Sequence, residues 1–286
     1  MNSFPKVIKN KKISRNWILQ NKFRGKTIAF VPTMGYLHKG HLALVEKANK
    51  LADLTVVSIY VNPTQFGPNE DFQEYPRNLD QDLEKLATFN VDLVFTPSDK
   101  EMYSEGFVTT IHVDKLTAPL CGARRPGHFD GVTTIVSKLF NIINPDFAVF
   151  GEKDFQQLAV IKRMVKDLDF NLKIESCPTI RESDGLALSS RNQYLTGKQR
   201  KEAPVIVKAL RRVKELVAQK QITTPSEVET RAKNIIKQNS NCAKIDYIQC
   251  LSADNLHEVN NFENSTVLAA AVFFGKTRLI DNIKLT

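Results

Sequence analysis

Two histidines, His38 and His41, stand three residues apart in the segment PTMGYLHKGH. The preceding run Thr27–Val31 is short and apolar, which is typical of a buried strand, and the residues that follow have helical apolar spacing. A strand, a glycine-containing loop and a helix start together favour a phosphate site, because the helix dipole and its amides attract anions. Imidazole N–H groups can also donate to developing charge. A turn carrying two solvated histidines is the alternative.

Two further polar loops precede or follow predicted elements. Asn62 and Gln65 follow the predicted strand Thr55–Val61, and their amides are suited to orienting a small polar substrate. Simple turn capping explains them equally well. Arg125 belongs to the loop RRPGHFDG before a predicted helix, which favours an anion, although a solvated basic loop fits the same residues.

Two more segments carry charged or hydroxyl groups. Lys153, in Gly151–Asp154, is close to a predicted helix start, where the dipole disfavours a cation unless an anion lies nearby. We therefore expect Lys153 to contact phosphate, while Asp154 is also a good helix N-cap. The segment Ile180–Asn192 offers two serines and an arginine that can close over a triphosphate, with a capped linker as the alternative.

The first part of the chain alternates strand-like and helix-like segments. This pattern predicts right-handed βαβ units and a mostly parallel sheet, with ligands at the carboxyl ends of the strands. The predicted strands are Thr27–Val31, Thr55–Val61, Val91–Phe95, Val108–Val113, Phe147–Phe150 and Leu172–Ser176. The predicted helices are approximately His41–Leu51, Asn78–Phe89, Gly131–Ile143 and Asp154–Leu168.

The character of the sequence changes after Glu182. Two helices are predicted, at Gly197–Gln219 and Pro225–Gln238, and they are followed by three strands. These strands are Lys244–Leu251, Ser265–Phe274 and Thr277–Lys284, the last two joined by a Gly275-Lys276 turn. We therefore expect two domains, an α/β domain over residues 1–182 and a smaller α+β domain over residues 183–286.

Composition narrows the class of protein. The 286 residues are 42% hydrophobic and 25% charged, as in ordinary soluble domains. The longest apolar run, Val267–Phe274, is too short to span a membrane, and no signal peptide is evident. The four cysteines lack the spacing of a zinc site and are interpreted as reduced thiols of a cytoplasmic protein. We expect no membrane partner.

The net charge of +9 suits acidic ligands such as nucleotides. It also leaves an RNA-binding module open, but there are no clustered aromatic residues to stack bases, so we expect no nucleic-acid partner. A zinc site at His38 and His41 has no evident third ligand. Walker-type, G-x-S-x-G and G-x-G-x-x-G motifs are absent from the sequence.

Five motifs, in this order and spacing, resemble the pantoate–β-alanine ligase family. They are PTMGYLHKGH, YVNPTQFGPNEDFQEYPR, RRPGHFDGV, GEKDFQQL and RESDGLALSSRNQYL, and they span about residues 27 to 195. The resemblance implies a Rossmann-like α/β domain of the HxGH nucleotidylyltransferase type with a smaller C-terminal lid domain. It also implies a cytoplasmic homodimer that condenses pantoate with β-alanine, using ATP and Mg²⁺, through a pantoyl adenylate. A related transferase that stops at a nucleotide product is the nearest alternative.

The resemblance also implies roles for individual residues. His41 matches a proton donor of the family, and His38 and Lys153 accompany it at the phosphates. Gln65 and Gln157 match pantoate ligands, and Gln65 adjoins β-alanine as well. Asp82, in Asp80-Gln81-Asp82, matches a Mg²⁺ ligand. The residues that match ATP contacts are Met34, Gly35, Tyr36, Leu37, His38, Lys39, Gly40, His41, Gly151, Glu152, Lys153, Asp154, Ile180, Leu188, Ser189, Ser190 and Arg191. Leu188 stands where methionine is common in the family, a substitution of similar volume.

Overall fold

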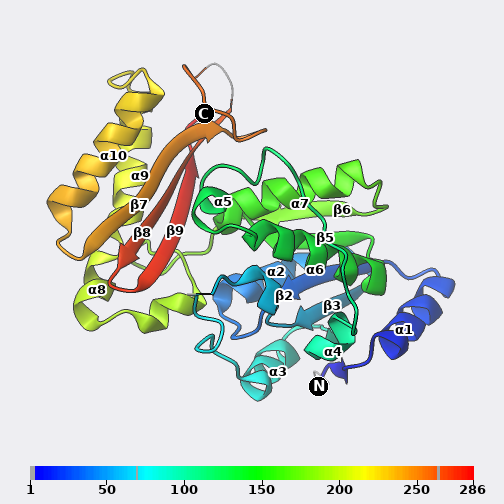
Figure 1. The fold of residues 1–286 in the computed structure, drawn as a ribbon. Coiled ribbons are helices and arrows are strands. Elements are labelled where there is room, and N and C mark those ends of the chain that lie inside the picture. The colour runs from blue at the N-terminus through cyan, green and yellow to red at the C-terminus, as the bar shows by residue number, and fades with distance from the viewer. Residues whose placement is uncertain (1–3, 69, 263–264) are drawn as a thin grey trace. The chain divides into compact units, whose positions relative to one another are not determined.

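The computed structural model describes residues 4–68, 70–262 and 265–286 (Figure 1). The chain divides into two compact units. The first comprises Met1–Glu152 and Val160–Pro178, and the second comprises Lys153–Ala159 and Thr179–Thr286. Each unit is described by itself below.

The described part of the first unit contains a six-stranded sheet in which every neighbouring pair is parallel. Its order is β1-β4-β3-β2-β5-β6, so β2 and β5 are neighbours and their following loops leave the same edge. The strands are β1 (Lys6–Ile8), β2 (Ile28–Thr33), β3 (Leu54–Ile59), β4 (Leu93–Phe95), β5 (Phe147–Gly151) and β6 (Lys173–Cys177). The predicted parallel α/β sheet is confirmed.

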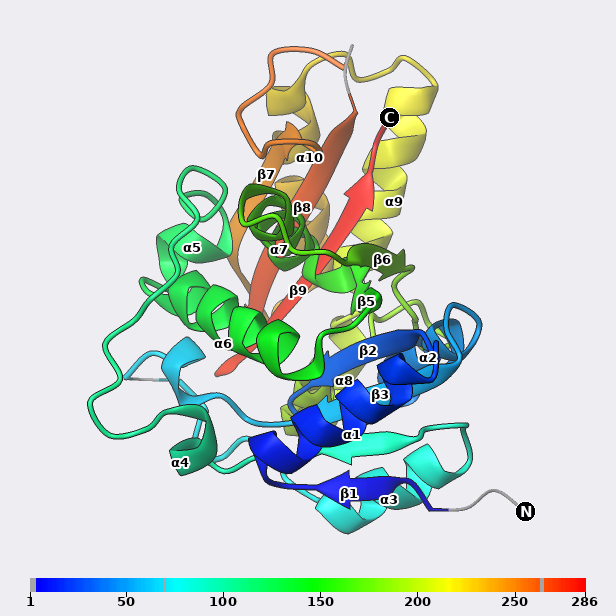
Figure 2. The same cartoon turned by 90° about the vertical axis from the view of Figure 1, so that its right-hand side faces the viewer.

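Alternate residues of β2 face opposite sides of this sheet, as the strand period requires. Ala29 and Val31 pack in one buried cluster with Val45 of α2 (Lys39–Asn49) and Leu86 of α3 (Leu79–Ala87). Phe30 instead meets Phe140 of α6 (His128–Ile143), with ring centroids 6.4 Å apart. Helix α1 (Lys11–Phe23) packs beside α6 (Figure 2). Both faces of the sheet are thus covered by helices, and the interior strand β2 reads as a continuous apolar run from Ile28 to Val31.

Shorter elements complete the first unit. They are the 3₁₀ turn η1 (Pro63–Gln65) and the helices α4 (Asp99–Met102) and α5 (Cys121–Arg124). The 3₁₀ turn η2 (Glu152–Asp154) begins in the first unit at Glu152 and continues in the second. Helix α7 (Phe155–Asp167) follows η2 and begins among the residues assigned to the second unit.

The second unit is an α+β structure with an antiparallel sheet of order β7-β8-β9 in its described residues. The strands are β7 (Ala243–Ser252), β8 (Thr266–Phe274) and β9 (Thr277–Lys284), and Gly275, with φ +61°, turns the last hairpin. Helices α9 (Val205–Ala218) and α10 (Pro225–Asn239) cover one face of this sheet (Figure 1). η3 (Ser190–Tyr194) and α8 (Gly197–Glu202) precede them. The predicted order of helices followed by a three-stranded meander is confirmed.

The predicted strand at Val108–Val113 is wrong. These residues form no strand, and Val108 is 91% exposed. Ile111 instead donates its backbone N–H to Thr134 Oγ1, and its carbonyl accepts from Thr133 Oγ1, both on α6. Helix side chains have therefore taken the hydrogen bonds that a neighbouring strand would supply.

The predicted single helix at Gly197–Gln219 is two helices. α8 ends at Glu202 and α9 begins at Val205, with Pro204 between them. Proline has no N–H to donate and its ring clashes with the preceding turn, so the helix breaks there. β1 and α1 were not predicted at all.

Candidate active site

The two histidines form a reciprocal cap at the start of α2. His38 is the N-cap residue, and its Nδ1 accepts the backbone N–H of Gly40 at 3.1 Å. The backbone N–H of His38 donates in turn to Nδ1 of His41 at 3.3 Å, and the ring centroids are 4.0 Å apart. Because each Nδ1 accepts a hydrogen bond, a neutral ring carries its own proton on Nε2. The caps therefore make both imidazoles hydrogen-bond donors through Nε2.

This geometry changes the sequence argument in one respect. We expected backbone amides of the helix start to bind the anion. The amides of His38 and Gly40 instead donate to imidazole nitrogens, and the Leu42 amide donates to the His38 carbonyl at 3.1 Å. The imidazole rings, rather than these amides, are the donors suited to a phosphate.

Asp82 does not fit a metal ligand. Its side chain is 1% exposed, and its two oxygens accept the backbone N–H groups of Tyr36 and Leu37 at 2.7 and 2.6 Å. Burial raises the pKa of Asp82, while these two donors and Lys85 oppose that shift. In the described residues, no group of three or more His, Cys, Asp or Glu side chains is placed to hold a metal. A Mg²⁺ ion here would depend on nucleotide phosphates and water rather than on Asp82.

Gln65 lies beside the histidine loop, because its Nε2 is 2.8 Å from the Met34 sulfur. Both residues follow neighbouring strands, Met34 after β2 and Gln65 in the turn after β3. Asn62 is 1% exposed and its amide is committed within the protein. It donates to the Gly131 carbonyl at 3.1 Å and accepts from the Tyr103 hydroxyl at 2.7 Å. Asn62 therefore holds the turn that carries Gln65 and does not present its amide to a substrate.

Gly131 allows this close approach of α6 to the Gln65 turn. A Cβ at Gly131 would lie 2.3 Å from the Thr64 carbonyl oxygen and 2.7 Å from the Gln65 nitrogen. These are backbone atoms that cannot move aside without shifting the turn. Glycine is required here by space, and the position of Gln65 depends on it.

Arg125 was predicted to bind substrate directly, but its guanidinium contacts other groups of the protein. Its guanidinium forms a two-pronged pair with Glu70, from Nε to Oε1 at 2.6 Å and from Nη2 to Oε2 at 2.5 Å. Arg125 Nη2 and His128 Nδ1 also contact the Gln65 carbonyl oxygen, at 3.3 and 2.7 Å. This network holds the backbone of the Gln65 turn.

The pKa of Glu70 reports the strength of that pairing. Partial burial alone would raise it, but the hydrogen bonds and charge of Arg125 outweigh burial and lower the pKa below its ordinary value. Glu70 and His128 lie within motifs on which the family resemblance depends, yet the sequence predicted no role for Glu70 and placed His128 only in a loop that favours an anion. The sequence offered one indication of this pairing: an acidic residue, Glu70, lies in one loop, and Arg125 and His128 lie in another.

Gly151 and Glu152 end β5 and begin η2 in the first unit. Glu152 Oε1 accepts the Ser176 hydroxyl of the neighbouring strand β6 at 2.7 Å. Gly151 has open space on its Cβ side, since no atom lies within 4 Å of a Cβ built there. This strand end is therefore accessible at Gly151 and tied to β6 at Glu152.

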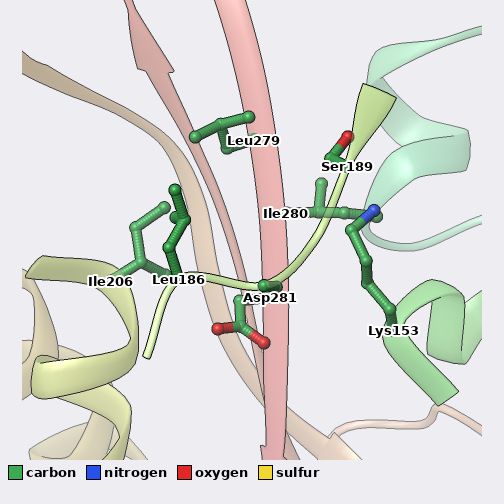
Figure 3. Close-up of a pocket in the computed structure, with 8 residues that line it drawn as sticks. Lys153, Leu186, Ser189, Ile206, Leu279, Ile280 and Asp281 are labelled. Atoms are coloured by element: carbon green, nitrogen blue, oxygen red, sulfur yellow. The ribbon is translucent and has the colours of Figure 1, made fainter. Parts of the chain in front are cut away.

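In the second unit, Lys153 and Ser189 line one small pocket with residues of β9 (Figure 3). The Lys153 side chain extends toward Ile280 and the Ser189 segment, and its backbone carbonyl accepts the Asn282 amide at 3.0 Å. Asp154 is 3.9 Å from the ammonium group, a loose contact. The structure thus brings two predicted ATP residues together within this unit.

Apart from Gln157, the remaining predicted residues of the second unit belong to a hairpin and the turn after it. The Leu188 N–H donates to the Ile180 carbonyl at 3.0 Å, and the Ser189 hydroxyl caps η3 by accepting the Arg191 N–H at 3.2 Å. Ser190 is buried and Arg191 is half-buried. Gln157, on α7, is also half-buried. These residues form ordered local structure rather than an open loop.

Ion pairs connect that hairpin to β9 and to α8. Arg181 pairs with the buried Asp281 of β9, at 2.6 and 2.9 Å. At the hairpin tip Arg200 pairs with Asp184 at 2.5 Å and Glu182 at 2.6 Å. The conformation of residues 180–188 thus depends on charged side chains that no local pattern singled out.

The parallel sheet with helices on both faces, the glycine loop after β2 and the histidine-capped helix define a Rossmann-like α/β protein. Residues 6–284 match the family described as pantoate-beta-alanine ligase. The chain belongs to this family. Within the described residues, no helix has the length and apolar character needed to cross a membrane.

Relatives named pantothenate synthetase are similar over nearly the whole chain. One from Caldicellulosiruptor saccharolyticus is 52% identical, covering 92% of each chain, and one from Sulfurihydrogenibium sp. is 50% identical, covering 97% of this chain and 99% of its own. The structure of pantothenate synthetase from Thermus thermophilus has a TM-score of 0.92 at 41% identity, covering 98% of this chain and 99% of its own. A Francisella tularensis pantoate-beta-alanine ligase, complexed with beta-gamma ATP and beta-alanine, has a TM-score of 0.77 at 37% identity, covering 98% of each chain.

Proposed function

We propose that this chain is an AMP-forming ligase that condenses pantoate with β-alanine. A pantoate carboxylate oxygen attacks the α-phosphorus of ATP, and the bond to the bridging oxygen breaks to release diphosphate. The β-alanine amine then attacks the acyl carbon of the pantoyl adenylate, loses a proton and expels AMP. The product is pantothenate, a precursor of coenzyme A.

The observation that carries the proposal is the reciprocal imidazole cap at the start of α2. It orients two Nε2–H donors by hydrogen bonds that form before any substrate binds. Adenylation is limited by charge that builds on phosphate, and preorganised donors lower that barrier without a covalent protein intermediate. Membership of the family, with relatives at 50–52% identity, supports the choice of reaction.

The residue roles follow from the chemistry of each group. We assign His41 and His38 to the departing diphosphate, and Lys153 to the triphosphate as a compact charge. Gln65, supported by Asn62 and Arg125, is suited to the hydroxyl and carboxylate groups of pantoate, and Gln157 is assigned to the same substrate. ATP and β-alanine are bound in the Francisella tularensis relative, which supports these two substrates.

Further features of the proposal concern the whole protein. We expect ATP to bind with Mg²⁺ held by its phosphates and by water, since Asp82 is committed to backbone N–H groups. We also propose that the protein is a cytoplasmic homodimer, and that residues 183–286 act as a lid domain over a catalytic domain of residues 1–182. Size-exclusion chromatography with light scattering checks the dimer.

Product analysis tests the reaction. The protein is incubated with Mg²⁺, ATP and pantoate, with and without β-alanine. Pantothenate and AMP in equal amounts, formed only when β-alanine is present in multiple-turnover assays, support the ligase. A stable nucleotide product that accumulates without β-alanine would instead identify a nucleotidylyltransferase.

A further inference from the structure

Two side chains of helix α3, those of Asp82 and Lys85, hydrogen-bond to the backbone just before the histidine cap. We call these contacts the clamp. Asp82 accepts the Tyr36 and Leu37 N–H groups, and Lys85 donates from Nζ to the Leu37 carbonyl at 2.7 Å. Asp82 and Lys85 are one helical turn apart and therefore lie on the same face of α3. The residue Leu37 is thus held at both its N–H and its C=O by side chains 45 and 48 positions away.

The segment held in this way has an unfavourable backbone conformation. Gly35 has φ +81° and Tyr36 has φ +49°, so two successive residues are in the left-handed region. For tyrosine this conformation is costly, and it persists only where surrounding contacts determine it. Successive N–H groups in such a turn converge and form an anion site. Here the carboxylate of Asp82 occupies it.

The fit around this carboxylate is close. A Cβ at Gly35 would lie 3.1 Å from Asp82 Oδ2 and 3.0 Å from Ile59 Cγ2. Leu37 is 2% exposed and packs in the same cluster as Leu86, which neighbours Lys85 on α3. Apolar packing therefore fixes the side chain of Leu37, while Asp82 and Lys85 fix its peptide groups.

We propose that Asp82 and Lys85 are positioning residues that set the Tyr36–Leu37 backbone and thereby aim His38 and His41. His38 is the next residue, so any rotation of the Leu37 peptide moves the N-cap and the imidazole pair with it. The role rests on the proposed function for its place in the reaction, but the clamp itself is a property of the first unit. It assigns Asp82 to the protein backbone and not to the metal.

The test compares Asp82→Asn and Lys85→Met with the wild-type protein. Asparagine keeps one acceptor oxygen but turns an NH₂ group toward one of the two N–H donors. Lys85→Met removes the ammonium contacts with the Leu37 carbonyl and the Gln81 side chain and keeps the length of the side chain, so it serves if Asp82→Asn does not fold. Asp80→Asn is the matched control, because Asp80 is an exposed carboxylate on the same helix.

Three quantities are measured: ATP affinity by calorimetry without pantoate, amide exchange of the peptide containing residues 34–38, and the half-saturating Mg²⁺ concentration at saturating ATP. We expect Asp82→Asn to weaken ATP binding roughly 10- to 100-fold, as misplaced contacts do, and to speed exchange of the Tyr36 and Leu37 amides. Lys85→Met should change ATP affinity and amide exchange in the same direction but by less, and Asp80→Asn should change neither quantity. The half-saturating Mg²⁺ concentration should be unchanged.

Two outcomes would overturn the clamp. In the first, Asp82→Asn raises the Mg²⁺ requirement while amide exchange stays slow, which would make Asp82 a metal ligand. In the second, ATP affinity and exchange both match the wild type. Failure of the proposed function would be a separate result. The wild-type protein would then make no pantothenate, while the amide-exchange and ATP-binding measurements would still decide whether Asp82 and Lys85 hold the loop.

Discussion

The histidine loop of the first unit and the 180–192 segment of the second are held by different kinds of interaction. In the first, backbone N–H groups of Tyr36, Leu37 and His38 donate to a buried carboxylate and an imidazole nitrogen. In the second, the hairpin tip is held by Arg200 through Asp184 and Glu182, whose side chains are 31–40% exposed. Both segments contain predicted ATP residues, but the carboxylate that holds the first is buried, whereas the ion pairs at the tip of the second are partly exposed.

This difference indicates which part of the site has its geometry fixed before substrate binds. Buried backbone hydrogen bonds are little affected by salt, whereas exposed ion pairs contribute about 0–1 kcal/mol each and are screened. The geometry of the imidazole donors should therefore depend little on ionic strength. We expect residues in the first segment to act mainly on the transition state, and those in the second to contribute more to binding.

His41→Ala gives the largest expected effect. It removes one preoriented donor and one half of the cap, so single-turnover adenylation is expected to fall by about two to four orders of magnitude. ATP affinity should fall much less. Rapid-quench measurement with radiolabelled ATP and pantoate checks the rate.

His112→Ala is the control, since His112 is an exposed histidine of the first unit that pairs with Asp130. It should adenylate at the wild-type rate. A His41→Ala protein that adenylates normally would remove His41 from the reaction.

Lys153→Met tests the second unit. It removes a compact charge and keeps side-chain length, and we expect roughly a 100-fold loss in kcat/KM for ATP. A larger share of that loss should be in KM than for His41→Ala. Lys162→Met, an exposed lysine of α7, is the matched control and should behave as wild type. A Lys153 effect confined to kcat would contradict the contrast between the two segments.

Gln157→Ala separates the two substrates. Loss of an amide hydrogen bond to pantoate should raise the KM for pantoate roughly 10-fold, while the KM for ATP changes little. Steady-state kinetics with each substrate varied in turn give both values. Equal increases for both would indicate general disruption of α7 rather than a pantoate contact.

Glu70→Gln gives the smallest effect and tests the support under Gln65. The folded-state pKa of Glu70 lies below its ordinary value of 4.5, so its ion pair stabilises the protein above pH 4.5 and is lost as pH falls through the lowered value. We expect the variant to be less stable by about 1 kcal/mol at pH 7. The difference should shrink below pH 4.5.

Urea denaturation of both proteins from about pH 3.5 to pH 7 measures that difference, a range that spans the ordinary carboxyl pKa. Glu84→Gln, an exposed carboxylate on α3, should show no such pH dependence. A Glu70→Gln difference that is constant with pH would mean that the pair is not the cause.

The sequence predicted the strands whose apolar runs are continuous. β2, β3 and β5 lie in the sheet interior, and burial on both faces leaves a run such as Ile28-Ala29-Phe30-Val31 that is easily recognised. β1 is three residues long at the sheet edge, with the pattern exposed, exposed, buried, so it leaves no periodic signal. Pro204 was a visible helix breaker that the amphipathic pattern on both sides obscured.

The parts of the candidate site that lie within a single local motif could be predicted from the sequence. The histidine spacing identified a helix start, and the structure confirms that α2 begins beside His38. The partners that fix the loop are distant: Asp82 lies 45 residues from Leu37, and Glu70 lies 55 residues from Arg125. Single-sequence patterns carry no information on such pairs. Asp82, Asn62 and Arg125 were therefore predicted to bind ligands, although their contacts hold the protein backbone.

Isotope transfer tests the proposed chemistry most directly. Pantoate labelled with ¹⁸O in its carboxylate is converted with ATP and β-alanine, and the AMP is analysed by mass spectrometry. If pantoate oxygen attacks the α-phosphorus, one labelled oxygen appears in each AMP formed. AMP without label, with the ¹⁸O lost from the carboxylate found instead in inorganic phosphate or in water, would contradict a pantoyl adenylate.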